Sequence, residues 1–370
     1  MIVLGIVIVM LWGLAFTFLY RIPTCAADSV PERYPTVSVI VPARDEERTL
    51  PRLLASLSGQ EMQPHEIIVV DDGSTDRTAE VARAAGARVV ASKPLPENWR
   101  GKTWACAQGA KAATGQVFLF VDADTFFEEG GWGRILDTFV ERRGVMSVGA
   151  YHRVERLYEE LSAFFNILMT AGTGAFTIAG RRRPPAGLFG PFLMVDRDAY
   201  YACGGHGAVR DKILENFHFA RQFRNRGISV RCLGGRGSFG MRMYPDGPAS
   251  LLEGWSKAFA SGSAETPKWI LLASVAWIAG AVLAAMWAGW GLAVWRPLQL
   301  ACGGALYLIF LLQLWSILRR IGSFRFVTAL VYPIPLLFYL VVFARSSIFA
   351  LFGKKVTWKG REIDVDSSKG

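Results

Sequence analysis

Residues 116–125 read QVFLFVDADT, an apolar run that ends in two aspartates one residue apart. A short run rich in Val and Phe is typical of a buried strand, so Asp122 and Asp124 are expected at a strand end, where the chain turns. Two carboxylates in such a place can share a divalent cation directly or through water. The same residues are also compatible with a helix N-cap beside a second, surface-exposed acid, so the cation site and the N-cap both remain possible at this point.

The segments upstream alternate between two patterns. Apolar, β-branched runs at 36–43 (TVSVIVPA), 66–74 (EIIVVDDGS) and 87–92 (ARVVAS) predict strands. Helical spacing is found between them, at residues 48–60, 78–87 and 103–115. This alternation predicts an α/β fold with a doubly wound, mostly parallel sheet. In such sheets ligands collect at the carboxyl ends of the strands.

Acidic residues also follow the first two of these strands. Asp71 and Asp72 end the second strand, where a carboxylate can accept hydrogen bonds from the ribose hydroxyls or the base amide of a nucleotide. Glu46 follows the first strand, but an acid at a helix start is also explained by the helix dipole. Because three acidic strand ends would face the same crevice, together they favour a ligand site over three separate caps.

Two later segments add candidate residues. Glu215 lies within ILENF in a helical stretch, where it can act as a general base or belong to a solvated helix face. Arg242 and Lys257 can bind phosphates, and Trp255 can stack on an acceptor. The segment around Trp255 also suits an amphipathic helix lying on a membrane, and the two roles are compatible.

Apolar residues concentrate near the two ends of the chain. The 370 residues are 52% hydrophobic and 19% charged. Residues 2–20 carry no charge and are long enough to cross a bilayer, which predicts an uncleaved anchor within 1–22. Three apolar segments follow Lys268, at 269–295, 298–318 and 326–344. Pro333 and Pro335 predict a break in the third segment, which would then re-enter the membrane and leave the basic tail 352–370 in the cytosol.

Between these apolar ends we expect a catalytic domain over 35–265, with an interfacial helix at about 161–180 and a membrane bundle over 268–351. The net charge of +10 is assigned to basic residues that flank apolar segments, facing the cytosol and membrane lipids, and no nucleic-acid partner is expected. The five cysteines show no metal or disulfide spacing, which predicts reduced thiols. These features place the chain in the inner (plasma) membrane with its catalytic domain on the cytosolic side.

A set of motifs resembles the family 2 glycosyltransferases with a GT-A fold, and within them a membrane branch that acts on C30 carotenoid acids. The motifs are PARDEE, DDGSTD, GKTWACAQGA, FVDADT, GPFLMVDRDAY, ILENF and RMYPDG with EGWSKAF. The resemblance covers nearly the whole chain. It implies inverting transfer of one sugar from a UDP-sugar donor, UDP-glucose, to a lipid-phase acceptor, a carotenoid carboxylic acid such as 4,4'-diaponeurosporenoate.

The resemblance also implies roles for individual residues. Asp72 and the Pro42–Glu46 loop would contact the uridine, and Asp122 and Asp124 would bind Mg²⁺ or Mn²⁺ together with the diphosphate. Many relatives carry a second acid where this chain has Asn216, so the base role moves to Glu215, with Asp211 in reserve. The residues expected to contact the substrates are Pro42, Arg44, Glu46, Asp71, Asp72, Lys102, Asp122, Arg242, Trp255 and Lys257.

The alternative functions are transfer of the sugar to a different acceptor and binding of the nucleotide sugar without any transfer. A hopanoid, a glycerolipid, a ceramide or a polyprenyl phosphate would leave the donor site unchanged. A polysaccharide synthase is disfavoured because the Gln-x-x-Arg-Trp motif is absent and the apolar segments are too few for an obvious export channel. A nucleotide-sugar-binding membrane sensor is the non-enzymatic alternative. The C-terminal apolar segments carry no acid or paired charges at mid-membrane, which argues against a transporter.

Overall fold

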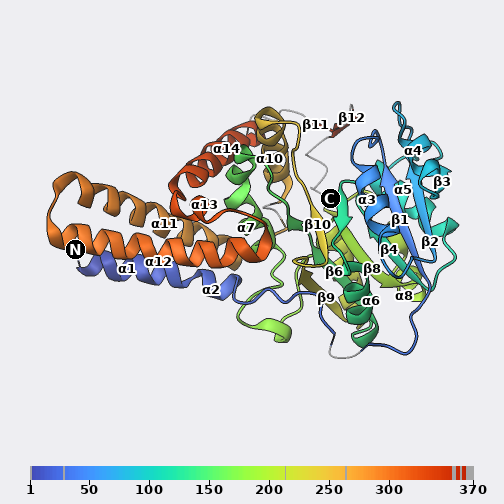
Figure 1. The fold of residues 1–370 in the computed structure, drawn as a ribbon, viewed down its shortest axis with the longest axis horizontal. Coiled ribbons are helices and arrows are strands. Elements are labelled where there is room, and N and C mark those ends of the chain that lie inside the picture. The colour runs from blue at the N-terminus through green and yellow to red at the C-terminus, as the bar shows by residue number, and fades with distance from the viewer. Residues whose placement is uncertain are drawn as a thin grey trace.

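The chain has an α/β body and a helical arm that extends from it (Figure 1). The structure is a computed structural model that describes residues 2–27, 30–212, 214–262, 265–351, 356–358 and 361–363. Side chains are described within these ranges except at residue 181, at 257–262 and from 347 onward.

A seven-stranded sheet forms the centre of the body, in the order β3-β2-β1-β4-β8-β6-β9. Its strands are β1 (Val37–Ala43), β2 (Glu66–Asp71), β3 (Arg88–Ala91), β4 (Val117–Val121), β6 (Val145–Gly149), β8 (Phe192–Asp196) and β9 (Val230–Gly234). Strands β3, β2, β1 and β4 are parallel, as the alternating pattern predicts. Strand β8 runs antiparallel to both β4 and β6, and β6 pairs in parallel with β9.

Alternate residues of the strands enter two separate cores, one on each face of the sheet. Ile40 and Phe118 belong to the first core, whereas Val39 and Leu119 belong to the second. This alternation follows from the two-residue period of a strand. Gly109 lets a helix lie close against β1, because a Cβ at this position would lie 2.4 Å from the Cγ2 atom of Ile40.

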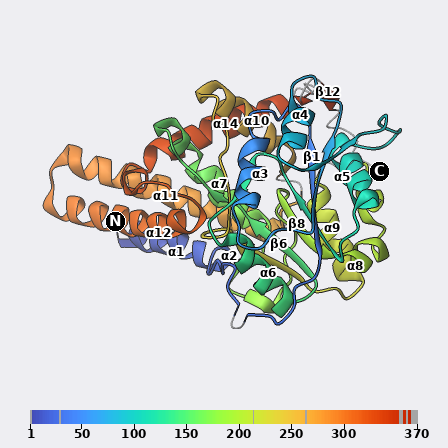
Figure 2. The same cartoon turned by 45° about the vertical axis from the view of Figure 1, so that its right-hand side comes forward.

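Helices cover both faces of the sheet, and they can be followed in the turned view of Figure 2. The α-helices of the body are α3 (Leu50–Ser58), α4 (Thr78–Ala84), α5 (Gly101–Ala112), α6 (Gly131–Glu141), α8 (Arg197–Ala202) and α9 (Glu215–Asn225). Short 3₁₀ helices are η1 (Leu157–Ser162), η2 (Gly180–Arg182) and η3 (Gly205–Val209). The helices expected at 48–60, 78–87 and 103–115 are therefore confirmed as α3, α4 and α5.

A second, three-stranded sheet has the order β5-β10-β7. It is built from β5 (Thr125–Phe127), β7 (Tyr151–His152) and β10 (Phe239–Met241). Strand β5 begins directly after Asp124, so this sheet adjoins the carboxyl end of β4. Two further short strands, β11 (Val356–Trp358) and β12 (Arg361–Ile363), pair in antiparallel near the C-terminus.

The arm is a bundle of apolar helices. Helix α11 (Lys268–Val294) and helix α12 (Pro297–Ile321) are both long and apolar enough to cross a membrane. Helix α1 (Ile2–Gly13), continued by α2 (Ala15–Phe18), lies along them (Figure 1). The Trp12 Nε1–H donates to the carbonyl of Ile309 over 3.1 Å, and the Gln313 amide donates to the carbonyl of Trp12 over 3.1 Å. The N-terminal segment is thus part of the same bundle as the C-terminal helices.

Four more helices lie between the arm and the body: α7 (Ala163–Gly172), α10 (Pro248–Gly262), α13 (Phe326–Leu330) and α14 (Pro333–Leu351). The break predicted in the third C-terminal apolar segment is confirmed, because α13 ends before Pro333 and α14 begins there. The helix expected over 161–180 is shorter than predicted, because it ends at Gly172 and Gly174 has a left-handed φ of 65°. Its interfacial role stays a prediction, as does the re-entrant topology.

Candidate active site

The carboxyl ends of strands β1, β2 and β4 line one cavity of about 240 Å³. The predicted residues that line it are Pro42, Arg44, Glu46, Asp72, Lys102, Asp122 and Asp124. They come from three strand ends and from the start of α5, which are distant in sequence. The parallel strand order explains this convergence, because the carboxyl ends of β2, β1 and β4 lie on the same edge of the sheet.

The two adjacent aspartates after β2 have different surroundings. Asp71 Oδ1 accepts a hydrogen bond from the Ser74 backbone N–H over 2.9 Å, which closes the turn around Gly73. Gly73 has a φ of 70°, a conformation that favours glycine. Asp72 instead lines the cavity, with its Oδ2 atom 3.8 Å from Arg44 Nη1. Asp71 is therefore engaged within its own turn, and Asp72 is the one that faces the cavity.

The loop after β1 is held against the start of α4. The Glu46 backbone N–H donates to Thr78 Oγ1 over 2.8 Å, and the Glu47 N–H donates to Asp76 Oδ2 over 3.0 Å. These bonds fix the loop so that the Glu46 side chain lines the cavity. Asp76 therefore acts as a local cap, since it also accepts from the Thr78 N–H over 2.9 Å.

Lys102 is the cation at the centre of the site. Its Nζ lies 2.7 Å from Asp122 Oδ1, 3.3 Å from the Gly190 carbonyl oxygen and 3.9 Å from Glu215 Oε1. Burial opposes the charge on the ammonium, but the Asp122 and Glu215 carboxylates outweigh burial and raise the pKa of Lys102. Lys102 therefore stays charged and connects β4, α5 and α9.

Asp122 and Asp124 provide the donor set expected for a divalent cation. Burial and the negative charges of Asp122 and Glu46 raise the pKa of Asp124, which shows that acidic groups crowd this part of the cavity. No cluster of three or more metal-ligating side chains occurs among the described residues. A pair of carboxylates fits Mg²⁺ or Mn²⁺ bound jointly with phosphate oxygens, because these cations take few protein ligands at such sites.

Glu215 is the first residue of α9 and lies on the wall of a second, smaller cavity beside Lys102. Its side chain is 18% exposed, and burial raises its pKa although Lys102 opposes the shift. The neighbouring Asn216 amide donates to the Leu188 carbonyl and so holds the start of α9. Asp211, the reserve base, is 52% exposed, pairs with Lys212 at 3.0 Å and lies beside a different surface depression.

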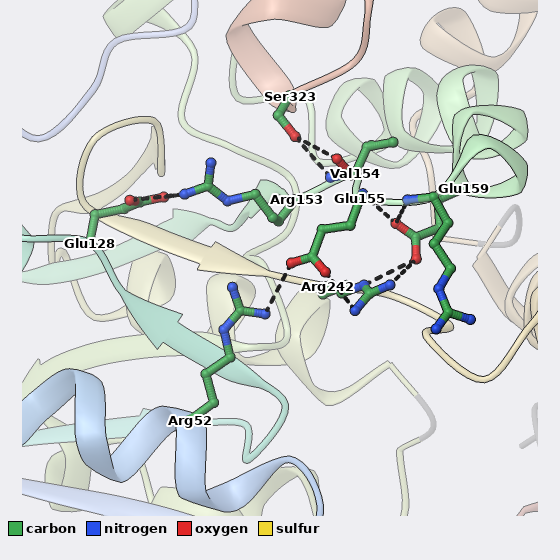
Figure 3. Close-up of polar contacts among 9 residues, drawn as sticks. Arg52, Glu128, Arg153, Val154, Glu155, Glu159, Arg242 and Ser323 are labelled. Atoms are coloured by element: carbon green, nitrogen blue, oxygen red, sulfur yellow. Dashed lines mark hydrogen bonds and ion pairs between the residues drawn. The ribbon is translucent and has the colours of Figure 1, made fainter.

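The remaining three predicted residues are placed differently. Arg242 forms ion pairs with Glu155 and Glu159, each at 2.7 Å, within the polar cluster drawn in Figure 3. Trp255 is fully buried on α10, where its Nε1–H donates to Ser162 Oγ over 3.0 Å and its ring stacks on Phe165. The side chain of Lys257 lies outside the described residues. A substrate role for these three residues stays a prediction.

Several residues at the site carry no local signal in the sequence. The smaller cavity is walled by Cys106, Phe120, Leu188, Phe189, Gly190, Leu193, His206 and Phe219, in addition to the predicted residues. His206 lies on the 3₁₀ helix η3, and Gly190 lies in the loop before β8. His206 reaches the site through tertiary contacts alone, whereas Cys106, Phe120 and Gly190 belong to the motifs GKTWACAQGA, FVDADT and GPFLMVDRDAY, which pointed towards part of this wall.

The fold is that of the GT-A glycosyltransferases. A mannosyltransferase from Pyrobaculum calidifontis, solved in complex with GDP-Man and Mn²⁺, superposes with a TM-score of 0.54. The superposition covers 95% of this chain and 99% of that chain at 17% sequence identity, so it bears on the fold alone.

Sequence comparison defines the family. The model of Glycosyl transferase family 2 matches residues 38–217. The 4,4'-diaponeurosporenoate glycosyltransferase of Staphylococcus haemolyticus is 33% identical over 336 residues, which are 89% of this chain and 89% of that protein. The protein of the same name from Staphylococcus aureus is 32% identical over 340 residues, which are 90% of this chain and 89% of that protein. This chain belongs to glycosyltransferase family 2 and is a glycosyltransferase.

Proposed function

We propose that this chain is a membrane-bound, inverting glycosyltransferase that transfers one glucosyl residue from UDP-glucose to a carotenoid carboxylic acid such as 4,4'-diaponeurosporenoate. One observation carries the proposal: Asp72, Asp122, Asp124 and Lys102 line one cavity in a chain similar over nearly its whole length to glycosyltransferases with that named acceptor. The apolar helices α11 and α12 suit an enzyme whose acceptor dissolves in the lipid phase.

The donor would lie across the edge of the sheet. Asp72 and the loop from Pro42 to Glu46 would hold the uridine, since their polar groups line the β1 and β2 side of the cavity. Asp122 and Asp124 would hold a divalent cation, Mg²⁺ or Mn²⁺. That ion, when bound, neutralises charge on the departing nucleoside diphosphate. Lys102 would add a second positive charge close to the same place.

Glu215 would act on the acceptor. In a direct displacement, an acceptor oxygen forms a bond to the anomeric carbon while the bond from that carbon to the diphosphate oxygen breaks. The UDP leaves with the electron pair, and the configuration at the anomeric carbon is inverted. An acceptor hydroxyl would lose its proton to Glu215, whereas a carboxylic acid is already ionised near neutral pH and would only be oriented by it.

An acceptor screen tests the proposal. Membranes containing the protein are incubated with radiolabelled UDP-glucose, or in parallel with other radiolabelled UDP-sugars, and with a C30 carotenoid acid, a hopanoid, diacylglycerol, ceramide or polyprenyl phosphate. The proposal predicts a labelled carotenoid glucosyl ester. Label in another lipid would reassign the acceptor, and label from another UDP-sugar would reassign the donor. Binding of UDP-glucose without release of UDP under any of these conditions would favour a sensor.

The location of the protein is part of the same proposal. The catalytic domain would face the cytosol, where UDP-sugars are made, and the helical arm would lie in the plasma membrane. Arg319 and Arg320 end α12 and Lys268 begins α11, so both basic ends lie on one side if the two helices cross as a hairpin. Protease protection of these loops in sealed inside-out vesicles would contradict this orientation.

A further inference from the structure

A small cavity lined by both Lys102 and Glu215 adjoins the larger one and shares Pro42, Lys102 and Asp122 with it. Its volume is about 20 Å³, which is enough for one water molecule. The ionisable groups on its wall are Lys102 and Cys106 of α5, Asp122 after β4, His206 of η3 and Glu215 of α9. Burial raises the pKa of Cys106, so its thiol stays protonated, and Asp122 already accepts a hydrogen bond from Lys102 on Oδ2 and pairs with it through Oδ1. Of these groups, Glu215 and His206 are the two that a water would join.

His206 is buried in an aromatic setting and is held in one orientation. It is 5% exposed, and its ring meets Phe120 and Phe219 edge to face at centroid distances of 4.7 and 4.9 Å. Burial and the nearby Lys102 charge lower the pKa of His206 to about 3. The ring is therefore neutral near neutral pH and carries a single N–H.

Tyr200 determines which ring nitrogen carries that proton. The Tyr200 hydroxyl accepts a hydrogen bond from the His206 backbone N–H over 3.1 Å, because a backbone amide can only donate. The hydroxyl hydrogen is then available for His206 Nδ1, which lies 2.9 Å away. Within the described part of the chain, no other acceptor pairs with this buried hydroxyl. Nδ1 is thus the acceptor, and the proton of the ring is on Nε2.

The Nε2–H has no protein acceptor among the described residues, and the ring lines the cavity that Glu215 also lines. Lys102 Nζ is 3.9 Å from Glu215 Oε1, which is longer than a hydrogen bond. A water in the cavity would accept from Nε2–H and donate to the Glu215 carboxylate, so that both groups would be satisfied.

We propose that His206 is a positioning residue for Glu215, acting through one water that accepts from the His206 Nε2–H and donates to the Glu215 carboxylate. This inference rests on the proposed function, in which Glu215 acts on the acceptor. The hydrogen-bonded series Tyr200–His206–water–Glu215 would orient the carboxylate from within this cavity, while Lys102, which also pairs with Asp122, lies 3.9 Å from it. The alternative is a core histidine satisfied by Tyr200 alone, and it predicts no effect of His206 on Glu215.

The first test observes the histidine directly and needs no activity. Full-length protein is labelled with ¹⁵N-histidine in detergent micelles, and its four histidines are resolved by NMR, with the His206→Gln variant assigning the signal. The proposal predicts a protonated Nε2 and an unprotonated Nδ1 for His206. It also predicts that Glu215→Gln shifts the Nε2 resonance. A protonated Nδ1, or an Nε2 resonance unmoved by Glu215→Gln, would overturn the proposal.

The second test uses glycosyl transfer in a double-mutant cycle. His206→Phe removes the donor and keeps the aromatic packing, and it should lower kcat about tenfold with little change in KM for the donor. His206→Gln, which keeps a donor near the Nε2 position, should recover most of the loss. In a Glu215→Gln background, His206→Phe should cost nothing further. Additive losses, or equal losses in the Phe and Gln variants, would overturn the proposal.

The two tests separate failure of this inference from failure of the proposed function. If Glu215→Gln retains full transfer activity, the catalytic role of Glu215 fails, and the NMR result alone decides whether the water link exists. If the Phe variant does not fold, as judged by its thermal midpoint, the Gln variant and the NMR signal still decide.

Discussion

Lys102 Nζ lies 2.7 Å from Asp122 Oδ1, so a cation of α5 pairs with one of the two carboxylates expected to hold a metal ion. The same ammonium is 3.9 Å from Glu215 Oε1. Lys102 thus joins the donor side and the acceptor side of the site. Without it, Asp122 and Glu215 would face each other with no opposing charge from α5.

Replacement of Lys102 by Met should destabilise the protein and increase its response to metal. Removing one partner of a partly buried ion pair leaves carboxylates uncompensated, which should cost about 2 kcal/mol of unfolding free energy. Added Mn²⁺ should then raise the thermal midpoint Tm more in Lys102→Met than in the wild-type protein. Lys111→Met, at an exposed position of the same helix, is the control. Equal Mn²⁺ responses in all three proteins would show that Lys102 and the metal do not share Asp122.

Arg242 should contribute to stability through its ion pairs, independently of any substrate role. Its partner Glu159 is fully buried, so Arg242→Met would leave an uncompensated carboxylate and should lower the unfolding free energy by about 3 kcal/mol. Arg52→Met is the matched control, because Arg52 is 43% exposed and reaches Glu155 only at 4.0 Å (Figure 3). That control should cost less than about 1 kcal/mol.

Donor kinetics then show whether Arg242 also binds phosphate. An unchanged KM for UDP-glucose in the folded Arg242→Met protein would restrict Arg242 to the ion-pair cluster. A KM increase with an unchanged Tm would contradict a stabilising role for the ion pairs of Arg242.

The strand ends of the N-terminal half could be predicted from the sequence because each strand is a short apolar run with an acidic turn behind it. The 36–43, 66–74 and 116–124 segments became β1, β2 and β4, and their parallel order brings Asp72, Asp122 and Asp124 to one cavity. The difference between Asp71 and Asp72 could not be predicted, since it depends on which carboxylate accepts from Ser74.

The far wall of the site could not be predicted, because it depends on tertiary contacts. Nothing local in the segment around His206 indicates that it lines the cavity beside Lys102, and although Gly190 belongs to the GPFLMVDRDAY motif, its contact with Lys102 depends on the fold. Arg242 suggested a phosphate ligand by its charge and motif, yet its side chain forms ion pairs with Glu159 of the 3₁₀ helix η1 and with Glu155 in the loop before it. The antiparallel insertion of β8 likewise depends on pairing partners distant in the chain.

His152 should make the stability of the protein depend on pH. It is 1% exposed and stacks on Phe324 of the α12–α13 loop, and burial lowers its pKa to about 4 although Glu159 opposes the shift. The unfolded chain takes up a proton near pH 6.5, whereas the folded protein does so only near pH 4. The contribution of neutral, buried His152 to the unfolding free energy is therefore fully present above pH 6.5. It is lost as the pH falls towards 4, which lowers the unfolding free energy by up to about 3 kcal/mol.

The Tm of the wild-type protein, measured from pH 7.5 to pH 4, should thus fall more steeply than that of His152→Phe. His65→Gln, at an exposed position, should follow the wild-type curve. Parallel curves for the wild-type and His152→Phe proteins would show that His152 does not titrate between these limits.

The most direct test of the account is titration calorimetry of UDP-glucose binding with and without Mn²⁺. It measures whether the strand-end carboxylates bind a sugar nucleotide through a cation. Wild-type protein should bind UDP-glucose far more tightly with Mn²⁺, and Asp124→Asn should lose on the order of 100-fold in that affinity and nearly all transfer activity. Asp198→Asn, an exposed acid of α8, should behave as wild type. Affinity and transfer activity of Asp124→Asn within a few-fold of the wild-type values, with Mn²⁺ in excess, would contradict the assigned site.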